Sequence, residues 1–141
     1  MGFFSAFKAF GTMAKPVQLD LNIEQWKWFL KVVRDARPRY RELAKWMGHD
    51  EKTVITNLHN ADSQIVRAWQ RLPYNGSILF SVLSLVHLGL LFQAERRFVY
   101  EPVSEATGLS ETERTQYKAA VSYCKFFEAQ IRTLIKPYVN G

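Results

Sequence analysis

The stretch SILFSVLSLVHLGLLFQA, residues 77–94, is the most apolar part of this 141-residue chain, and its interpretation decides the fold. From Ile78 to Phe92 it runs for fifteen residues without a charged side chain. A bilayer span needs roughly 20 apolar residues, so this length is closer to that of a helix buried in a protein core. We therefore expect a core helix over 77–94, begun by Ser77, with a membrane span as the alternative.

Helical patterns continue on both sides of this stretch. Asn22 followed by Gln25 is a capping box that predicts the start of a first helix. Ser110 followed by Glu113 is a second capping box, which predicts the start of a long C-terminal helix. The predicted helices cover residues 22–36, 39–47, 51–60, 63–71, 77–94 and 110–136. The fold class is therefore mainly α, a compact helical domain.

One segment between the last two predicted helices favours a strand. Residues 95–103, ERRFVYEPV, contain Phe98, Val99 and Tyr100, which have high strand propensity. Pro102 is typical of an edge strand or of a strand's end. We expect a short strand or β-hairpin near 95–103.

The beginning of the chain differs from the rest. Phenylalanines recur there at helical spacing, and Pro16 separates them from the predicted helices. We expect residues 1–15 to form an amphipathic N-terminal arm and residues 16–141 to form a single helical domain. The arm would dock on the protein's own core, on a second subunit or on a membrane surface. The residues that would make this contact are Phe3, Phe4, Phe7 and Phe10.

The composition limits the classes of function. A net charge of +6 favours anionic partners such as nucleic acid, anionic lipid or an acidic protein. The single cysteine, Cys124, excludes an internal disulfide framework, and the three histidines show no metal-ligand spacing. No common phosphate-loop, dinucleotide, zinc-protease or hydrolase motif occurs. We expect no catalysis, no cofactor and no metal, and a cytoplasmic location with a membrane-associated one as the alternative.

Residues 40–58, YRELAKWMGHDEKTVITNL, are the most informative segment for function. Leu43 and Ala44 stand where one helix packs on the next, and Gly48 permits a left-handed turn between them. Val54 and Leu58 would anchor the second helix. The segment resembles a helix-turn-helix DNA-binding unit. That resemblance implies a small transcriptional regulator whose second helix enters the major groove.

The resemblance and the local charge indicate the candidate contacts. Between Trp26 and Trp46, seven cations stand against two carboxylates, which suits contacts to phosphates. Within the unit, Asn57 would read an adenine edge, and Lys52 a guanine or a phosphate. The candidate nucleic-acid-binding residues are Arg37, Arg39, Arg41, Lys45, Lys52, Thr53, Thr56 and Asn57.

Two functions from different classes remain. The first is a nucleic-acid-binding regulator, a homo-oligomer held together by the C-terminal helix or by the N-terminal arm. The alternative is a non-enzymatic structural or assembly protein at a membrane, such as a virion matrix-like component or an accessory subunit of a membrane complex.

Overall fold

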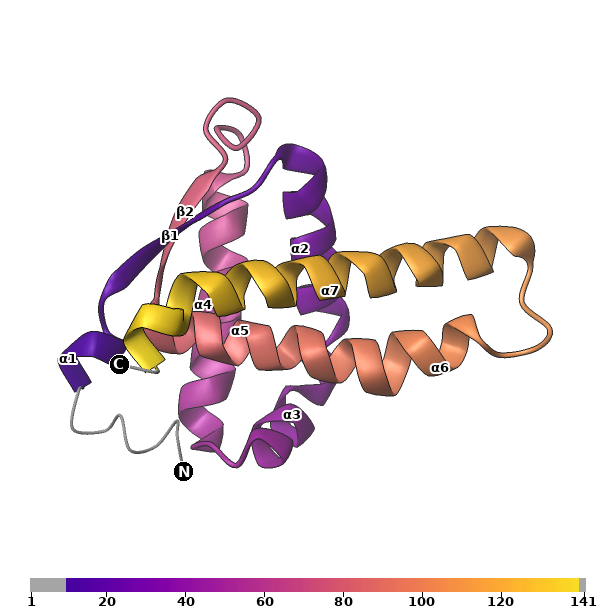
Figure 1. Cartoon of the computed structure of the whole chain (residues 1–141), viewed down its shortest axis with the longest axis horizontal. Coiled ribbons are helices and arrows are strands. Elements are labelled where there is room, and N and C mark those ends of the chain that lie inside the picture. Colours follow the sequence, from indigo (N-terminus) through magenta and orange to yellow (C-terminus); the bar gives the residue numbers. More distant parts are fainter. Residues whose placement is uncertain (1–9, 140–141) are drawn as a thin grey trace.

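Helices make up most of the protein, of which the computed structural model describes residues 10–139 (Figure 1). The helices are α1 (Phe10–Met13), α2 (Ile23–Asp35), α3 (Tyr40–Met47), α4 (Glu51–Ala68), α5 (Val82–Glu95), α6 (Glu101–Ser104) and α7 (Glu111–Val139). A 3-10 turn, η2 (Arg37–Arg39), precedes α3, and a π-helical turn, η3 (Arg96–Tyr100), joins α5 to α6. The two strands are β1 (Pro16–Asp20) and β2 (Ser77–Ser81). The mainly α fold predicted from the sequence is confirmed, including its long C-terminal helix.

The body of the molecule consists of two layers of helices (Figure 1). α2 and α4 lie side by side in one layer, and α5 and α7 cross in front of them. On α5, His87 Nδ1 lies 3.1 Å from Asn57 Nδ2 of α4, and a Cβ added to Gly89 would lie 3.3 Å from Ile131 Cγ2 of α7. Residues two positions apart point in roughly opposite directions around a helix. α5 therefore contacts α4 behind it and α7 beside it through different sides of its surface.

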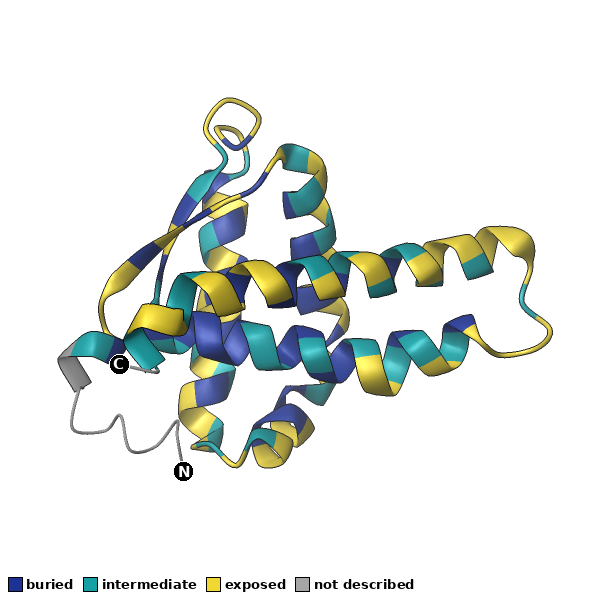
Figure 2. Ribbon diagram, in the orientation of Figure 1, coloured by how far each residue is buried: buried dark blue, intermediate teal, exposed yellow. Residues whose placement is uncertain are grey.

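The core surrounds α5, whose residues are mostly buried on every side (Figure 2). Leu85 and Leu88 are 0% exposed. Aromatic rings join the layers, because Phe29 of α2 contacts Phe92 of α5 and Phe127 of α7 at centroid distances of 4.7 and 5.1 Å. The predicted core helix is thus present. Among the helices described, none combines the length and the hydropathy that crossing a bilayer requires.

A small sheet closes one side of this core. β1 pairs antiparallel with β2, with Val17 opposite Phe80 and Leu19 opposite Ile78. These four side chains are buried, whereas the alternate positions of both strands are exposed or half-buried. This alternation is the expected pattern for a sheet with one face on the core.

The turn before β2 is tied to the start of α2 at Gly76. The carbonyl oxygen of Gly76 accepts a hydrogen bond from Trp26 Nε1 at 2.7 Å and another from the backbone N–H of Leu21 at 3.1 Å. A Cβ on Gly76 would lie 1.9 Å from the carbonyl oxygen of Leu21. Only glycine fits this close approach of two backbone segments.

The predicted strand or hairpin near 95–103 is wrong. The chain stays helical there, because η3 and α6 continue from the end of α5. The backbone N–H of Glu101 bonds to the carbonyl oxygen of Arg96, which is the wider i+5 pattern of a π-helical turn. Pro102, which has no N–H to donate, directly follows this π-helical turn in the first turn of α6. The strands that do form are at the other end of the helix, in β1 and β2.

Three predicted helix boundaries also differ. Ser77 lies in β2, and Ser81 caps α5 instead, its hydroxyl accepting from the backbone N–H of Ser84. The two helices expected over 51–60 and 63–71 are one continuous helix, α4. Pro137 does not stop α7, because it lies in the last turn, where only one intrahelical bond is lost.

The predicted N-terminal arm lies mostly outside the described residues. Phe3, Phe4 and Phe7 belong to that part, and so does the side chain of Phe10, which begins α1. Met13, near the end of the arm, is buried in the core next to the start of β1. Contact of the phenylalanines with a membrane or a partner stays a prediction.

Candidate nucleic-acid interface

The turn between α3 and α4 has the geometry that its sequence predicts. Gly48 adopts a left-handed conformation, with φ 71°, and its N–H bonds to the carbonyl oxygens of Ala44 and Lys45. Asp50 then caps α4, accepting hydrogen bonds from the backbone N–H of Thr53 at 3.0 Å and from its hydroxyl at 2.7 Å. α3 packs on α4 beyond this turn.

α4 has a buried side and an exposed side. Val54, Leu58, Ala61 and Ile65 recur at helical spacing and are 0% exposed. The exposed residues of α4 are Lys52, Thr53, Thr56, His59, Asn60, Ser63, Val66 and Arg67. None of these carries a negative charge. We call these exposed residues the α4 face. The α4 face is polar and weakly basic over the length of the helix.

The arginines around Pro38, which we call the basic corner, are bound to carboxylates of the protein itself; they are Arg37, Arg39 and Arg41. Asp62, whose side chain is 9% exposed, accepts from Arg34 Nε and from Arg37 Nη2, both at 2.9 Å. The two guanidinium groups therefore neutralise a nearly buried carboxylate and hold α2 and η2 to α4. Arg37 is placed for this structural role rather than for a free phosphate contact.

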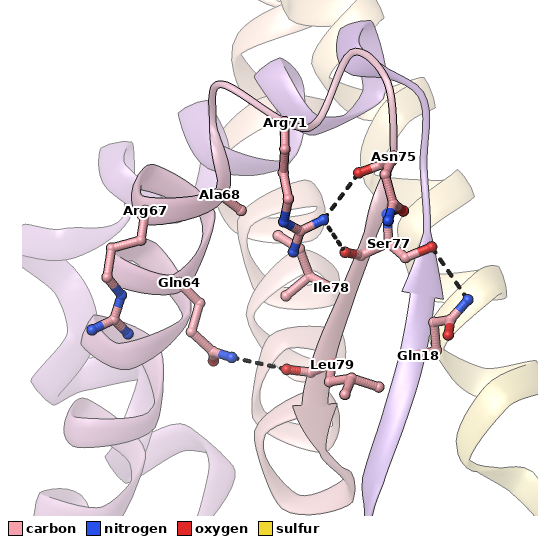
Figure 3. Close-up of a pocket in the computed structure, with 9 residues that line it drawn as sticks. All are labelled: Gln18, Gln64, Arg67, Ala68, Arg71, Asn75, Ser77, Ile78 and Leu79. Atoms are coloured by element: carbon pink, nitrogen blue, oxygen red, sulfur yellow. Dashed lines mark hydrogen bonds between the residues drawn. The ribbon is translucent and has the colours of Figure 1, made fainter.

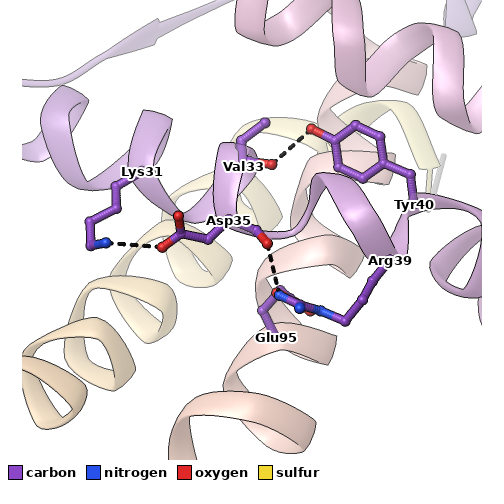
Figure 4. A network of polar contacts seen from close by, with 6 residues as sticks. All are labelled: Lys31, Val33, Asp35, Arg39, Tyr40 and Glu95. Atoms are coloured by element: carbon purple, nitrogen blue, oxygen red, sulfur yellow. Dashed lines mark hydrogen bonds and ion pairs between the residues drawn. The ribbon is translucent and has the colours of Figure 1, made fainter.

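Arg39 and Arg41 are engaged in the same way. Arg39 forms a close ion pair with Glu95 of α5, whose side chain is 2% exposed, and also donates to the backbone carbonyl of Asp35 at 3.0 Å (Figure 4). Arg41 Nε lies 2.6 Å from Glu51 Oε1, in a more exposed pair. The basic corner therefore contributes less free positive charge than the sequence suggests.

Three predicted contact residues lie at the start of the α4 face, and a fourth is exposed on α3. Lys52, Thr53 and Thr56 are exposed on α4, and Lys45 is exposed on α3. The hydroxyl of Thr53 is occupied by the cap of α4, so Lys45, Lys52 and Thr56 retain free donors there. These residues form the part of the predicted site that the structure brings together.

Asn57 points toward α5 instead of outward. Its amide nitrogen lies 3.1 Å from His87 Nδ1, and His87 Nε2 lies 3.0 Å from His49 Nδ1. An amide nitrogen only donates, so His87 Nδ1 accepts and its Nε2–H donates to His49. Reading of an adenine by Asn57 is therefore disfavoured by its existing hydrogen bond.

This chain of hydrogen bonds requires a neutral His87. Burial and, as the smaller cause, the nearby His49 together lower the pKa of His87 to about 4. Burial also lowers the pKa of His49. His49 follows the turn glycine, so the pair fastens the turn between α3 and α4 to the core helix.

A pocket of about 560 Å³ continues the α4 face toward β2 (Figure 3). Arg71 Nη1 donates to the carbonyl oxygens of Asn75 and Ser77, at 3.0 and 2.8 Å, and Gln64 Nε2 donates to that of Leu79 at 2.8 Å. Arg67 makes no ion pair with any described residue, and no carboxylate lines the pocket. The pocket thus extends the α4 face with polar and cationic groups.

Sequence reasoning missed the second half of the α4 face. Asn60, Ser63 and Arg67 follow Thr56 at spacings of four, three and four residues, which places them on one side of a continuous helix. The signal was present, but the helix was expected to break near residue 61.

Neither a protein-family model, nor a curated protein, nor a solved structure matches this chain.

Proposed function

We propose that this protein is a non-enzymatic nucleic-acid-binding protein, a small regulator whose α4 face lies against the major groove of a duplex. The observation that carries the proposal is the α4 face itself. It follows a left-handed glycine turn, begins at a side-chain cap and exposes hydrogen-bonding and cationic side chains without a carboxylate. An α-helix of this kind fits the width of the major groove.

The charges on α4 are arranged to suit this partner. Its carboxylates are Glu51, which is paired with Arg41, and Asp62, which is nearly buried and paired with Arg34 and Arg37. The free cations stand at the two ends, Lys52 near the start and Arg67 near the end of the helix. Cations at the two ends of the helix suit contacts to the phosphate backbone of the duplex. The neutral polar side chains between them suit contacts to the base edges in the groove.

Placing carboxylates on the α4 face tests the proposal. We expect Thr56→Glu with Ser63→Glu to weaken binding of a short duplex by at least about tenfold, because like charges then meet at the interface. Both side chains are exposed, and glutamate is a good helix former, so the fold should be retained. Fluorescence anisotropy of a labelled duplex at low salt measures the change.

The matched control adds the same two charges elsewhere. Ala106 and Thr107 are exposed in the loop before α7. Ala106→Glu with Thr107→Glu should bind the duplex nearly as well as the wild type. Equal binding by both variants, or no binding by the wild type, would contradict the proposal.

A second candidate, an assembly role at a membrane, rests on an exposed aromatic pair. Trp46 of α3 is 42% exposed and Phe98 of η3 is 57% exposed, and their rings meet at a centroid distance of 5.8 Å. The Arg97 guanidinium lies 5.6 Å from the ring centre of Phe98. Aromatic rings beside cations are typical of contacts with lipid headgroups. Flotation with phosphatidylserine vesicles that is lost on Trp46→Ala with Phe98→Ala would favour this candidate, and unchanged flotation would remove it.

A further inference from the structure

The outer face of α7 carries a row of cations that no described carboxylate neutralises. Its members are Lys118, Lys125, Arg132 and Lys136, which are all exposed and form no ion pair with a described residue. Glu128 is the only carboxylate between residues 114 and 139, and it faces inward, where Arg96 Nε donates to it at 2.7 Å. We call these four residues the α7 row. They contrast with the basic corner, whose arginines are bound to carboxylates.

The α7 row is straight and lies on one side of its helix. Lys118, Lys125 and Arg132 are seven residues apart, and seven residues make nearly two full turns. From Lys118 to Lys136 the row spans roughly 27 Å at 1.5 Å per residue. That length matches about eight base-pair steps at 3.4 Å each.

The surroundings of the α7 row favour a contact made by charge alone. The apolar side of α7 is buried, with Cys124, Phe127 and Ile131 at 0 to 1% exposed. None of the exposed large hydrophobic side chains among the described residues lies on α7. A helix that enters a bilayer or forms a dimer seam presents an apolar surface. The α7 row presents cations and small polar groups, which suit a phosphate backbone.

The α7 row and the α4 face belong to different layers of the molecule, because α4 lies in one layer of helices and α7 in the other (Figure 1). We propose that the α7 row is a second nucleic-acid surface, which contacts phosphates without reading sequence, so that one molecule holds two duplexes. This inference rests on the proposed function of the α4 face. It adds a bridging role to a sequence-reading one.

A capture experiment tests the second surface. One duplex is fixed to beads, the protein is added, and retention of a second, labelled duplex is measured. We expect the wild type to retain the second duplex, and Lys125→Gln with Arg132→Gln to reduce retention to the level of beads without protein. The same variant should still bind the fixed duplex, through the α4 face.

Two further variants distinguish loss of the phosphate contact at the α7 row from unfolding of the protein. Ser122→Glu with Ala129→Glu adds carboxylates within the α7 row, three or four residues from its cations, where they support the helix. This variant should also lose capture. Lys27→Gln with Arg97→Gln removes the same two positive charges from other elements and should capture like the wild type.

The outcomes distinguish the two proposals. A wild type that binds the fixed duplex but retains no second one, or α7 variants that retain it as well as the wild type, would overturn the second surface while leaving the α4 face standing. A wild type that binds no fixed duplex would overturn the function itself. Vesicle binding that depends on Lys125 and Arg132, without capture, would assign the α7 row to a membrane and overturn the inference.

Discussion

Asp62 and Glu95 bind arginines that precede α3 and so keep them from acting as free cations. Both side chains are nearly buried, at 9% and 2% exposed, and each is bound by guanidinium groups. A buried carboxylate is tolerated when it is paired and becomes costly when its partner is removed. Arg37 therefore holds η2 to α4, and Arg39 holds it to α5, although the sequence alone suggests a phosphate-binding corner.

Removing Arg39 should thus affect stability before it affects binding. We expect Arg39→Ala to lower the free energy of unfolding by about 3 kcal/mol, because Glu95 is left buried and unpaired. Arg41→Ala breaks a more exposed pair, so its cost should stay below about 1 kcal/mol. Urea unfolding followed by tryptophan fluorescence compares the two. Equal stability losses would mean that Glu95 does not depend on Arg39.

His87 should make the protein less stable in mild acid. Its pKa is about 4 in the folded state, whereas an unfolded histidine has a pKa of about 6.5. As the pH falls below that value, the unfolded chain takes up a proton that the folded protein does not bind. This difference should remove about 2 kcal/mol of stability by pH 5.

Substitution isolates this contribution from that of other groups. Urea unfolding of the wild type and of His87→Gln is compared at pH 7.5 and pH 5. The wild type should lose about 2 kcal/mol more than the variant between the two values. His59→Gln, at an exposed position of α4, should keep the wild-type pH dependence. The same pH dependence in His87→Gln would contradict the neutral hydrogen-bonded state.

At the scale of elements, the structure depends on where β2 begins. The turn at Gly76 joins β2 to the start of α2, and Ser81 converts the strand into α5 at once. Residues 77–81 and 82–95 share one apolar run, so the sequence pattern shows no boundary between them. Pairing with β1, which is far away in the chain, selects the strand over an earlier start of the helix.

Glycine substitutions test this junction. Gly76→Ala should destabilise the protein by more than about 2 kcal/mol, because its Cβ would meet the Leu21 carbonyl oxygen at 1.9 Å. Gly89→Ala is the matched control, since its Cβ would meet Ile131 Cγ2 at 3.3 Å while alanine improves the helix. Thermal unfolding of both variants measures the difference. A mild effect at Gly76 would show that the turn can move.

For the molecule as a whole, local signals in the sequence predicted more than long-range ones. The caps at Asn22 and Ser110 and the turn at Gly48 act over a few residues, and all three are confirmed. The partners of Arg37, Arg39 and Asn57 come from other elements, so no spacing rule could reveal them. The sequence pattern thus agrees with the exposure of Lys52, Thr53 and Thr56 at the start of α4 but not with the ion-paired state of the arginines before α3. Contact of these residues with nucleic acid stays a prediction.

The overall arrangement places two polar, carboxylate-poor faces on the two layers of helices, one on α4 and one on α7. α5 supplies the apolar core, which leaves α4 and α7 free to expose polar side chains along their outer faces (Figure 2). In this chain of 141 residues with a net charge of +6, the α4 face and the α7 row thus carry cations that no described carboxylate pairs. The proposed function depends on a single helix, α4.

Photo-cross-linking from the α4 face tests that claim most directly. Cys124 is 0% exposed and burial raises the pKa of its thiol, so a new surface cysteine can carry the cross-linker alone. Ser63→Cys and, as a control directly after α6, Glu105→Cys are each labelled and irradiated with a radiolabelled duplex. The account predicts that Ser63→Cys cross-links to the duplex and that Glu105→Cys does not. A bound duplex that cross-links equally from both positions, or from neither, would contradict it.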